Sequence, residues 1–181
     1  HVHFRDPGFT YKEDVETGAR SAAAGGYTTV VCMANTKPVI DNVEVLKELE
    51  KREETLPIHV YNTAAVTMGL KGKEPTDMPE LLKAGAIGFT DDGIPIKDEK
   101  LVMEAMKTAA QLDVPISFHE EDPDLIGNSG INSGEVARKL GLEGAPALAE
   151  EVLVARDCLL ALRTGAKINI QHVSSEVSVQ I

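Results

Sequence analysis

The chain begins with two histidines, His1 and His3, at a spacing that suits a metal site. Side chains on an extended strand alternate between two faces, so both imidazoles are expected to point the same way. Two neutral imidazoles aimed at one point bind a divalent transition metal well. Arg5 continues the alternation, and its guanidinium suits a substrate carboxylate. The first residues therefore predict a metal-binding and substrate-binding site at the end of a strand.

Later polar residues could complete this site, because they also stand at the downstream ends of strand-like apolar runs. A lone histidine at a strand end is usually structural. Here four of the five histidines fall at such ends, and two of them form the His-x-His pair. This clustering favours metal binding. The pattern predicts His1, His3, His119 and His172 as metal ligands, together with one carboxylate of the pair Asp91 and Asp92.

Other residues near these runs allow two interpretations. Asp91 and Asp92 are either part of a turn or a source of a carboxylate that bridges two metal ions. Adjacent residues on an extended segment point in opposite directions, so only one of the two is expected at the site. Asn35 is either an ordinary turn residue or a partner of Arg5 in binding a polar substrate. His59 falls early in its strand and is expected in packing or at the surface.

Composition narrows the class of protein. The chain has 181 residues, 43% of them hydrophobic, which suits one globular domain. Its formal net charge of −11 argues against a nucleic-acid or anionic-membrane partner. No apolar run is long enough to span a bilayer. Two cysteines without CxxC spacing, Cys32 and Cys158, indicate a reduced, cytoplasmic compartment.

Strand-like and helix-like segments alternate along the chain. The predicted strands are 1–4, 27–33, 57–64, 86–90, 114–119 and 167–172. The predicted helices are a segment capped by Thr10 and Glu13 that ends near Ala24, then 42–54, a short helix from Asp77 to Gly85, 98–112 and 146–164. The segment 127–144 is expected to be a loop with one short helix at 135–140.

This alternation predicts an α/β fold with parallel strands and right-handed crossovers. Two architectures are open: a (β/α)8 TIM barrel, of which about six strands are present, and a doubly wound open sheet. The barrel is favoured because every predicted site residue lies where a strand meets the following loop. In a barrel those ends surround one mouth. In an open sheet the outer ends are too far apart to share a ligand.

Several motifs resemble the dihydroorotases of the amidohydrolase superfamily, of the bacterial type that carries an aspartate among the metal ligands. The motifs are His1-Val-His-Phe-Arg-Asp-Pro-Gly8, Met33-Ala-Asn-Thr-Lys-Pro38, Gly88-Phe-Thr-Asp-Asp-Gly93, His119-Glu-Glu-Asp122 and Gln171-His-Val-Ser174. The resemblance extends over essentially the whole chain. Many relatives bridge their metals with a carboxylated lysine, but segment 85–93 contains no lysine.

The resemblance implies a set of roles. Two zinc ions are expected, one held by His1 and His3 and the other by His119 and His172, with Asp92 as the metal-binding carboxylate. Arg5 and Asn35 are expected to bind the substrate carboxylate. The implied reaction is the reversible cyclisation of N-carbamoyl-L-aspartate to L-dihydroorotate in pyrimidine synthesis, which makes the protein a zinc-dependent cyclic amide hydrolase.

The resemblance also implies that residues 1–181 are one fragment of a catalytic barrel, without the flanking β-domain and the last barrel strands. The aspartate that moves the proton is expected beyond Ile181, so the fragment alone is predicted to be inactive. The intact protein is expected to be a homodimer, with an aspartate transcarbamoylase as a candidate partner. The alternatives are another cyclic amidohydrolase, such as an allantoinase or hydantoinase, and an inactive homologue that supports a transcarbamoylase.

Overall fold

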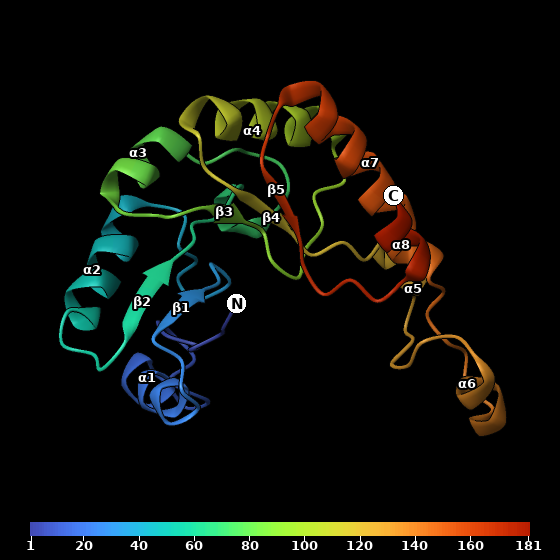
Figure 1. The fold of residues 1–181 in the computed structure, drawn as a ribbon, viewed down its shortest axis with the longest axis horizontal. Coiled ribbons are helices and arrows are strands. Elements are labelled where there is room, and N and C mark those ends of the chain that lie inside the picture. Colours follow the sequence, from blue (N-terminus) through green and yellow to red (C-terminus); the bar gives the residue numbers. More distant parts are fainter.

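The computed structural model describes residues 1–181, in which five short strands lie parallel to one another (Figure 1). The first two strands pair together, and the other three form a second set in the order β3-β4-β5. All five predicted internal strands are present, although each is shorter than its apolar run. The strands are β1 (Thr29–Cys32), β2 (His59–Asn62), β3 (Phe89–Thr90), β4 (Ile116–Phe118) and β5 (Ile168–Ile170).

Isolated parallel bridges join these strands into one continuous order. Val2 bridges to Cys32 on β1, and Ala64 just beyond β2 bridges to Phe89 on β3. The order therefore follows the chain, from the N-terminal segment through β1 to β5, without the reversal that defines a doubly wound sheet. Within these residues the sheet stays open, because the N-terminal segment and β5 are its two edges.

Five main helices lie on the outer side of the strands and form an arc around them (Figure 1). One cluster of 27 buried apolar residues runs between helices and strands, so these elements share one hydrophobic core. Val30 and Cys32 of β1 face this core, together with Leu46, Leu81 and Met106 from three different helices. The five helices are α1 (Val15–Ala24), α2 (Val43–Glu53), α3 (Met78–Ala84), α4 (Glu99–Leu112) and α7 (Leu148–Thr164).

Side-chain caps explain where most of these helices begin. Asn42, Asp77 and Asp98 each accept a hydrogen bond from the backbone N–H three residues later, at the starts of α2, α3 and α4. The predicted start of α1 was wrong. Asp14 and Thr17 form its capping box, four residues after Thr10, so Thr10 lies outside the helix.

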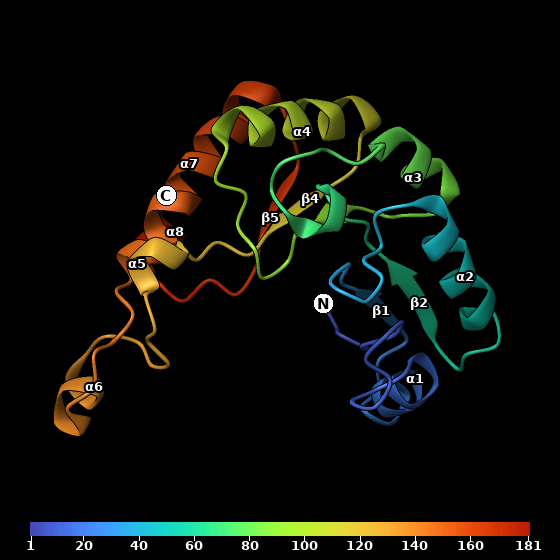
Figure 2. The ribbon, with the colours of Figure 1, turned by 180° about the vertical axis from the view of Figure 1, so that it is seen from behind.

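The segment after β4 forms an arm that extends away from the rest of the molecule in both views (Figures 1 and 2). It carries α5 (Pro123–Ile126) and α6 (Glu135–Leu140), and the second of these confirms the predicted short helix. Sequence analysis did not predict α5, the 3-10 helix η1 (Met68–Leu70) or α8 (Glu176–Gln180). No helix combines the length and the apolar character that a membrane crossing needs.

Candidate metal centre

The five predicted ligands come together at the carboxyl ends of the parallel strands. Their side-chain nitrogen and oxygen atoms form two groups around a shared Asp92, and within each group the atoms lie within 4.8 Å of one another. The strand ends meet at one mouth because the strands run parallel and in chain order. The groups are His1, His3 and Asp92, and Asp92, His119 and His172.

The first group surrounds one side of the Asp92 carboxylate. His1 Nε2 lies 3.7 Å from Asp92 Oδ1, and His3 Nε2 lies 3.4 Å from Asp92 Oδ2. The two Nε2 atoms are 3.0 Å apart. Tetrahedral zinc with Zn–N distances near 2.05 Å separates two ligand nitrogens by about 3.3 Å. The spacing of this histidine pair therefore fits a common ion.

The second group surrounds the other side of Asp92. His119 Nδ1 lies 3.4 Å from Asp92 Oδ1, and the rings of His119 and His172 have centroids 5.0 Å apart. The ring of His172 also lies 4.6 Å from that of His1, so the two groups are continuous. Because Asp92 belongs to both groups, its carboxylate is the one side chain that could bridge two ions.

Two buried atoms without hydrogen-bond partners show that these side chains suit a cation. Asp92 Oδ1 and His119 Nδ1 are both buried, and neither has a hydrogen-bond partner. Buried polar atoms are costly to leave unpaired, and a carboxylate oxygen and an imidazole nitrogen are both good ligands for a divalent transition metal. The donor set of the site therefore fits a metal ion.

The charges at the site shift the pKa values of three groups. Burial raises the pKa of Asp92, but the adjacent His119 and the charge of His3 outweigh burial and hold this pKa below its usual value. The Asp92 carboxylate in turn raises the pKa of His119. Burial lowers the pKa of His3 by more than Asp92 and the hydrogen bond with Asn35 raise it, and so favours its neutral, metal-binding form.

Asp91 points away from the metal centre. Its Oδ1 accepts hydrogen bonds from the backbone N–H groups of Val66 (2.7 Å) and Thr67 (3.0 Å), and its Oδ2 accepts one from the Thr67 hydroxyl. The neighbouring aspartates thus face opposite sides, as expected for an extended segment. Asp91 anchors the loop after β2, whereas Asp92 faces the histidines.

Asn35 lies between two of the candidate ligands. Its Oδ1 is 3.0 Å from His3 Nδ1, and its Nδ2 donates to Asp92 Oδ2 at 3.0 Å. Hydrogen bonds of this kind fix the orientation of metal ligands. In this structure Asn35 therefore contacts the candidate ligands, a role that its position after β1 did not suggest.

The expected strand at residues 1–4 is reduced to one bridge at Val2. Arg5 does not continue its alternation, because the backbone φ of Arg5 is +60° and ends the extended conformation. The alternation that predicted the place of Arg5 at the site therefore ends at Arg5 itself, and Arg5 directly precedes the turn.

Sequence analysis did not identify the contact between α7 and the loop after β5. Glu150 accepts hydrogen bonds from the backbone N–H groups of Ser174 (2.8 Å) and Ser175 (3.0 Å). This loop carries His172, whose φ of +55° lies in the left-handed region. The only signal for this contact was an acidic residue in the first turn of a long helix.

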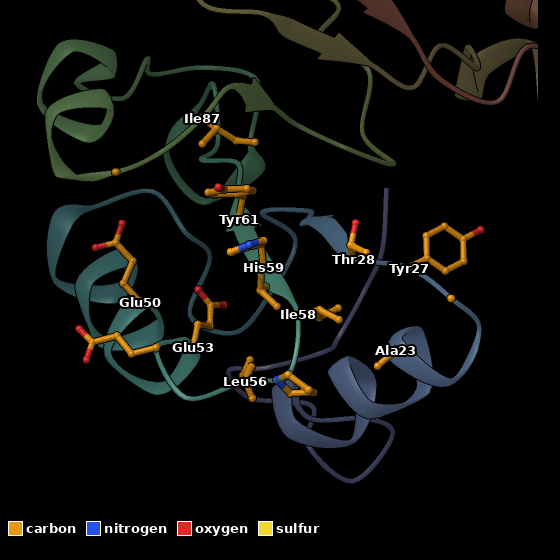
Figure 3. A pocket seen from close by; sticks show the side chains of 15 residues that line it. Ala23, Tyr27, Thr28, Glu50, Glu53, Leu56, Ile58, His59, Tyr61 and Ile87 are labelled. Atoms are coloured by element: carbon orange, nitrogen blue, oxygen red, sulfur yellow. The ribbon is translucent and has the colours of Figure 1, made fainter.

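Two cavities lie at opposite ends of the strands. A cavity of about 390 Å³ adjoins His119 and His172 at the mouth. A larger one, of about 890 Å³, is lined by residues that precede or begin the strands, among them Tyr27, Ile58 and His59 (Figure 3). His59 thus lies away from the metal centre and is exposed, which confirms its predicted place at the surface.

The comparisons of this sequence with known proteins agree on one family. A family model described as "Dihydro-orotase-like" matches residues 1–178. Proteins named dihydroorotase are 60% identical in Clostridioides difficile (strain 630) and 49% identical in Lactococcus lactis subsp. lactis, each over 181 residues. These matches cover 100% of the chain, which spans 43% of the length of either relative.

Solved structures agree in fold. An L-hydantoinase (dihydropyrimidinase) from Arthrobacter aurescens superposes with a TM-score of 0.78 at 22% identity, over 99% of this chain and 42% of that one. A dihydroorotase from Saccharomyces cerevisiae in complex with 5-fluoroorotic acid gives 0.67 at 17% identity, over 99% and 48%. At this identity the likeness shows the fold alone, which this chain shares with the corresponding part of the hydantoinase and the dihydroorotase.

Proposed function

Because the chain belongs to the dihydroorotase-like family, we propose that the protein to which it contributes is a dihydroorotase. Such an enzyme interconverts L-dihydroorotate and N-carbamoyl-L-aspartate in pyrimidine synthesis. The observation that carries this proposal is the convergence of four histidines on Asp92 at one mouth of the parallel strands.

Within this proposal the metals are two zinc ions. His1 and His3 would hold one, His119 and His172 the other, and Asp92 would be shared. Zinc at such a site acidifies bound water to give hydroxide near neutral pH and polarises a carbonyl oxygen. The supporting observations are the spacing of the His1 and His3 nitrogens and the unpaired buried atoms of Asp92 and His119.

The substrate is a carboxylate, and Arg5 with Asn35 would bind it. A guanidinium presents paired N–H donors that match a carboxylate, and an asparagine amide adds a neutral donor. Asn35 already contacts His3 and Asp92, so it would link substrate binding to ligand orientation. This assignment is tested by Arg5→Met, which is expected to raise KM for dihydroorotate strongly and to leave zinc content unchanged.

The ring-opening reaction also needs an acid for the departing nitrogen. The chain spans 43% of the length of its curated relatives. We assign only metal and carboxylate binding to its residues, and propose that the acid and the remaining strands of an eight-stranded barrel come from outside residues 1–181. The 181-residue chain alone is then expected to bind zinc but not to hydrolyse dihydroorotate. Normal turnover by that chain would contradict this assignment.

The closest rival is a hydantoinase or an allantoinase, because hydantoinases share the fold. Arg5 and the absence of lysine in segment 85–93 favour dihydroorotase. Initial rates of the full-length protein with dihydroorotate, hydantoin and allantoin distinguish the three. Dihydroorotate is expected to be hydrolysed at least tenfold faster than the others, and faster hydrolysis of either rival substrate would overturn the proposal.

An inactive homologue that supports a transcarbamoylase is the other rival. All five candidate ligands are in place, which favours an enzyme, and metal analysis of the full-length protein tests this. Two zinc ions per chain are expected, and none would support the inactive homologue. The homodimer and the transcarbamoylase partner remain part of the proposal. So does a cytoplasmic location, which the two free cysteines support.

A further inference from the structure

The segment that carries His3 and Arg5 extends beyond the sheet. The last ladder contacts are made by Val2, whose N–H donates to Val31 and whose carbonyl accepts from Met33. After this point Arg5 adopts a φ of +60°, a conformation that non-glycine residues rarely adopt. The sheet therefore ends before His3 and Arg5, and a contact besides that of His3 with Asn35 must hold this segment in place.

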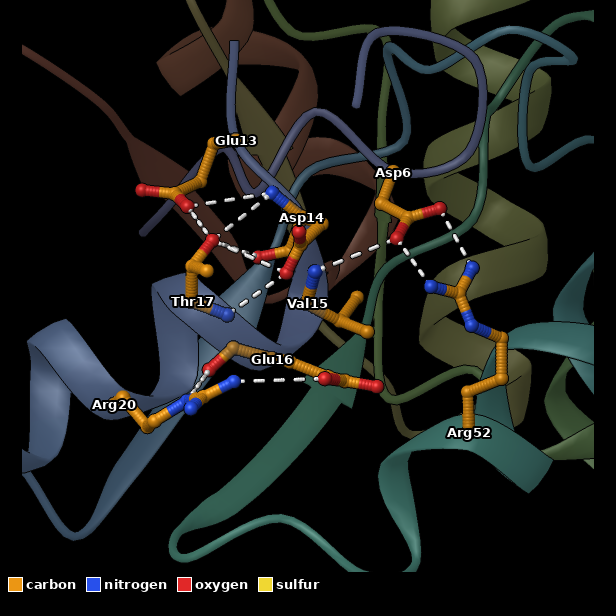
Figure 4. A network of polar contacts seen from close by, with 8 residues as sticks. All are labelled: Asp6, Glu13, Asp14, Val15, Glu16, Thr17, Arg20 and Arg52. Carbon is orange, nitrogen blue, oxygen red and sulfur yellow. Dashed lines mark hydrogen bonds and ion pairs between the residues drawn. The ribbon is translucent and has the colours of Figure 1, made fainter. Parts of the chain in front are cut away.

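That contact is made by Asp6. Its Oδ1 and Oδ2 accept hydrogen bonds from both terminal nitrogens of Arg52, at 2.7 and 2.6 Å (Figure 4). Oδ2 also accepts a longer bond, 3.4 Å, from the N–H of Val15 at the start of α1. The Asp6 side chain is only 1% exposed. Asp6 thus ties the turn after Arg5 to the last turn of α2 and to the first turn of α1.

Phe4 adds a second attachment on the same side. It is buried in the core, and its ring packs so closely on α1 that a Cβ at Gly18 would lie 2.3 Å from Phe4 Cδ1. Phe4 and Asp6 face the helices, whereas His3 lies beside Asp92 in the candidate metal centre and Arg5 stands between Phe4 and Asp6 in the chain. The Asp6–Arg52 pair is the polar end of this attachment, and it is bidentate, so it fixes orientation as well as distance.

We propose that the Asp6–Arg52 ion pair is the positioning device that holds His3 and Arg5 at the mouth. Neither residue is a candidate metal ligand. The ion pair acts through the backbone that joins Asp6 to Arg5 and His3. For the effect on substrate binding this inference rests on the proposed function, whereas the effect on metal binding does not.

The test uses the full-length protein with Asp6→Asn and Arg52→Lys. Asp6→Asn keeps the shape but weakens the pair, and Arg52→Lys keeps the charge but removes the bidentate geometry. Substitution of residues that orient metal ligands typically costs 10-fold to 100-fold in metal affinity or activity. We expect at least a tenfold loss of Co²⁺ affinity, followed by visible absorption, and a rise in KM for dihydroorotate that exceeds the fall in kcat.

A nearby ion pair supplies the matched control. Arg20 and Glu16 of α1 lie 3.5 Å apart in the same region, but both side chains are about two-thirds exposed (Figure 4). Arg20→Gln is therefore expected to leave Co²⁺ affinity and KM at wild-type values. The exchanged double variant, Asp6→Arg with Arg52→Asp, is expected to bind Co²⁺ better than the single variant Asp6→Arg.

The outcomes separate this inference from the proposed function. Folded Asp6→Asn and Arg52→Lys proteins that bind Co²⁺ as tightly as wild type would overturn the positioning role, whatever the enzyme turns over. If Asp6→Asn does not fold, the Arg52→Lys variant decides alone, because the Arg52 side chain is half-exposed. If the wild type binds Co²⁺ but does not hydrolyse dihydroorotate, the proposed function fails and Co²⁺ affinity still decides the positioning role.

Discussion

The adjacent residues Asp91 and Asp92 are expected to respond to substitution in opposite ways. Asp91→Ala removes the acceptor of three donors, the N–H groups of Val66 and Thr67 and the Thr67 hydroxyl. A buried donor left unpaired costs about 1–3 kcal/mol. Burial of the Asp91 carboxylate is itself unfavourable and raises its pKa, so removal of this carboxylate offsets part of the destabilisation. A net destabilisation of about 3 kcal/mol follows.

Asp92→Asn is expected to change stability by only about 1 kcal/mol in the absence of metal. Its Oδ2 has Asn35 as its one hydrogen-bond donor, and its Oδ1 has none. The same substitution removes the carboxylate shared by both histidine groups, so Zn²⁺ affinity is expected to fall at least 100-fold. Asp91→Ala should retain Zn²⁺ binding wherever it remains folded.

The measurement is urea unfolding of the metal-free chain at pH 7, followed by circular dichroism, with Zn²⁺ titration of each variant. With a urea m-value of about 2 kcal/mol/M, a loss of 3 kcal/mol moves the midpoint down by about 1.5 M. Asp91→Asn is the graded control, because it keeps one oxygen for the two N–H groups and should shift the midpoint by about 0.5 M. The reasoning would be refuted if Asp91→Ala unfolded at the wild-type midpoint, or if Asp92→Asn bound zinc normally.

Three other measurements probe different parts of the molecule. Burial raises the pKa of Glu53 from 4.5 to about 7, so the folded chain keeps a proton there that the unfolded chain loses, and stability falls as pH rises through this range. Glu53→Gln should therefore raise stability by about 2–3 kcal/mol at pH 8 but not at pH 4, and equal effects at both values would contradict this. Gly18→Ala should destabilise by about 1–3 kcal/mol through its clash with Phe4, whereas Gly25→Ala, with its nearest neighbour at 3.4 Å, should be nearly neutral in thermal unfolding. Zinc at 100 times its Kd should stabilise the chain by about 2.7 kcal/mol, and a chelator or Asp92→Asn should abolish the gain in a melting experiment.

Local sequence predicted most of the elements because their signals are local. The capping side chains Asn42, Asp77 and Asp98 each act within one turn of the helix that they begin. Apolar runs between helices predicted the five internal strands. At α1 the predicted cap was wrong, because Asp14 rather than Thr10 is the residue whose side chain accepts a hydrogen bond from the first turn.

The sequence by itself also determined which residue types gather at the mouth. Parallel strands in chain order bring their carboxyl ends together, so histidines at those ends had to meet once the order was established. The position of Asp91 and Asp92 in the sequence did not determine which of the two aspartates faces the histidines. The choice between Asp91 and Asp92 depends on the rotation of a two-residue strand, and that rotation follows from the donors of Val66 and Thr67 across the loop.

Only the tertiary structure decided the contacts between residues far apart in the chain. Asp6 meets Arg52 across 46 positions, and Glu150 meets Ser174 across 24. Neither contact has a sequence period or a cap signal, because each arises where a loop at a strand end reaches a helix packed outside the sheet. Residue types and spacing predicted the candidate metal-binding groups, but the attachment of those groups depended on the packed fold.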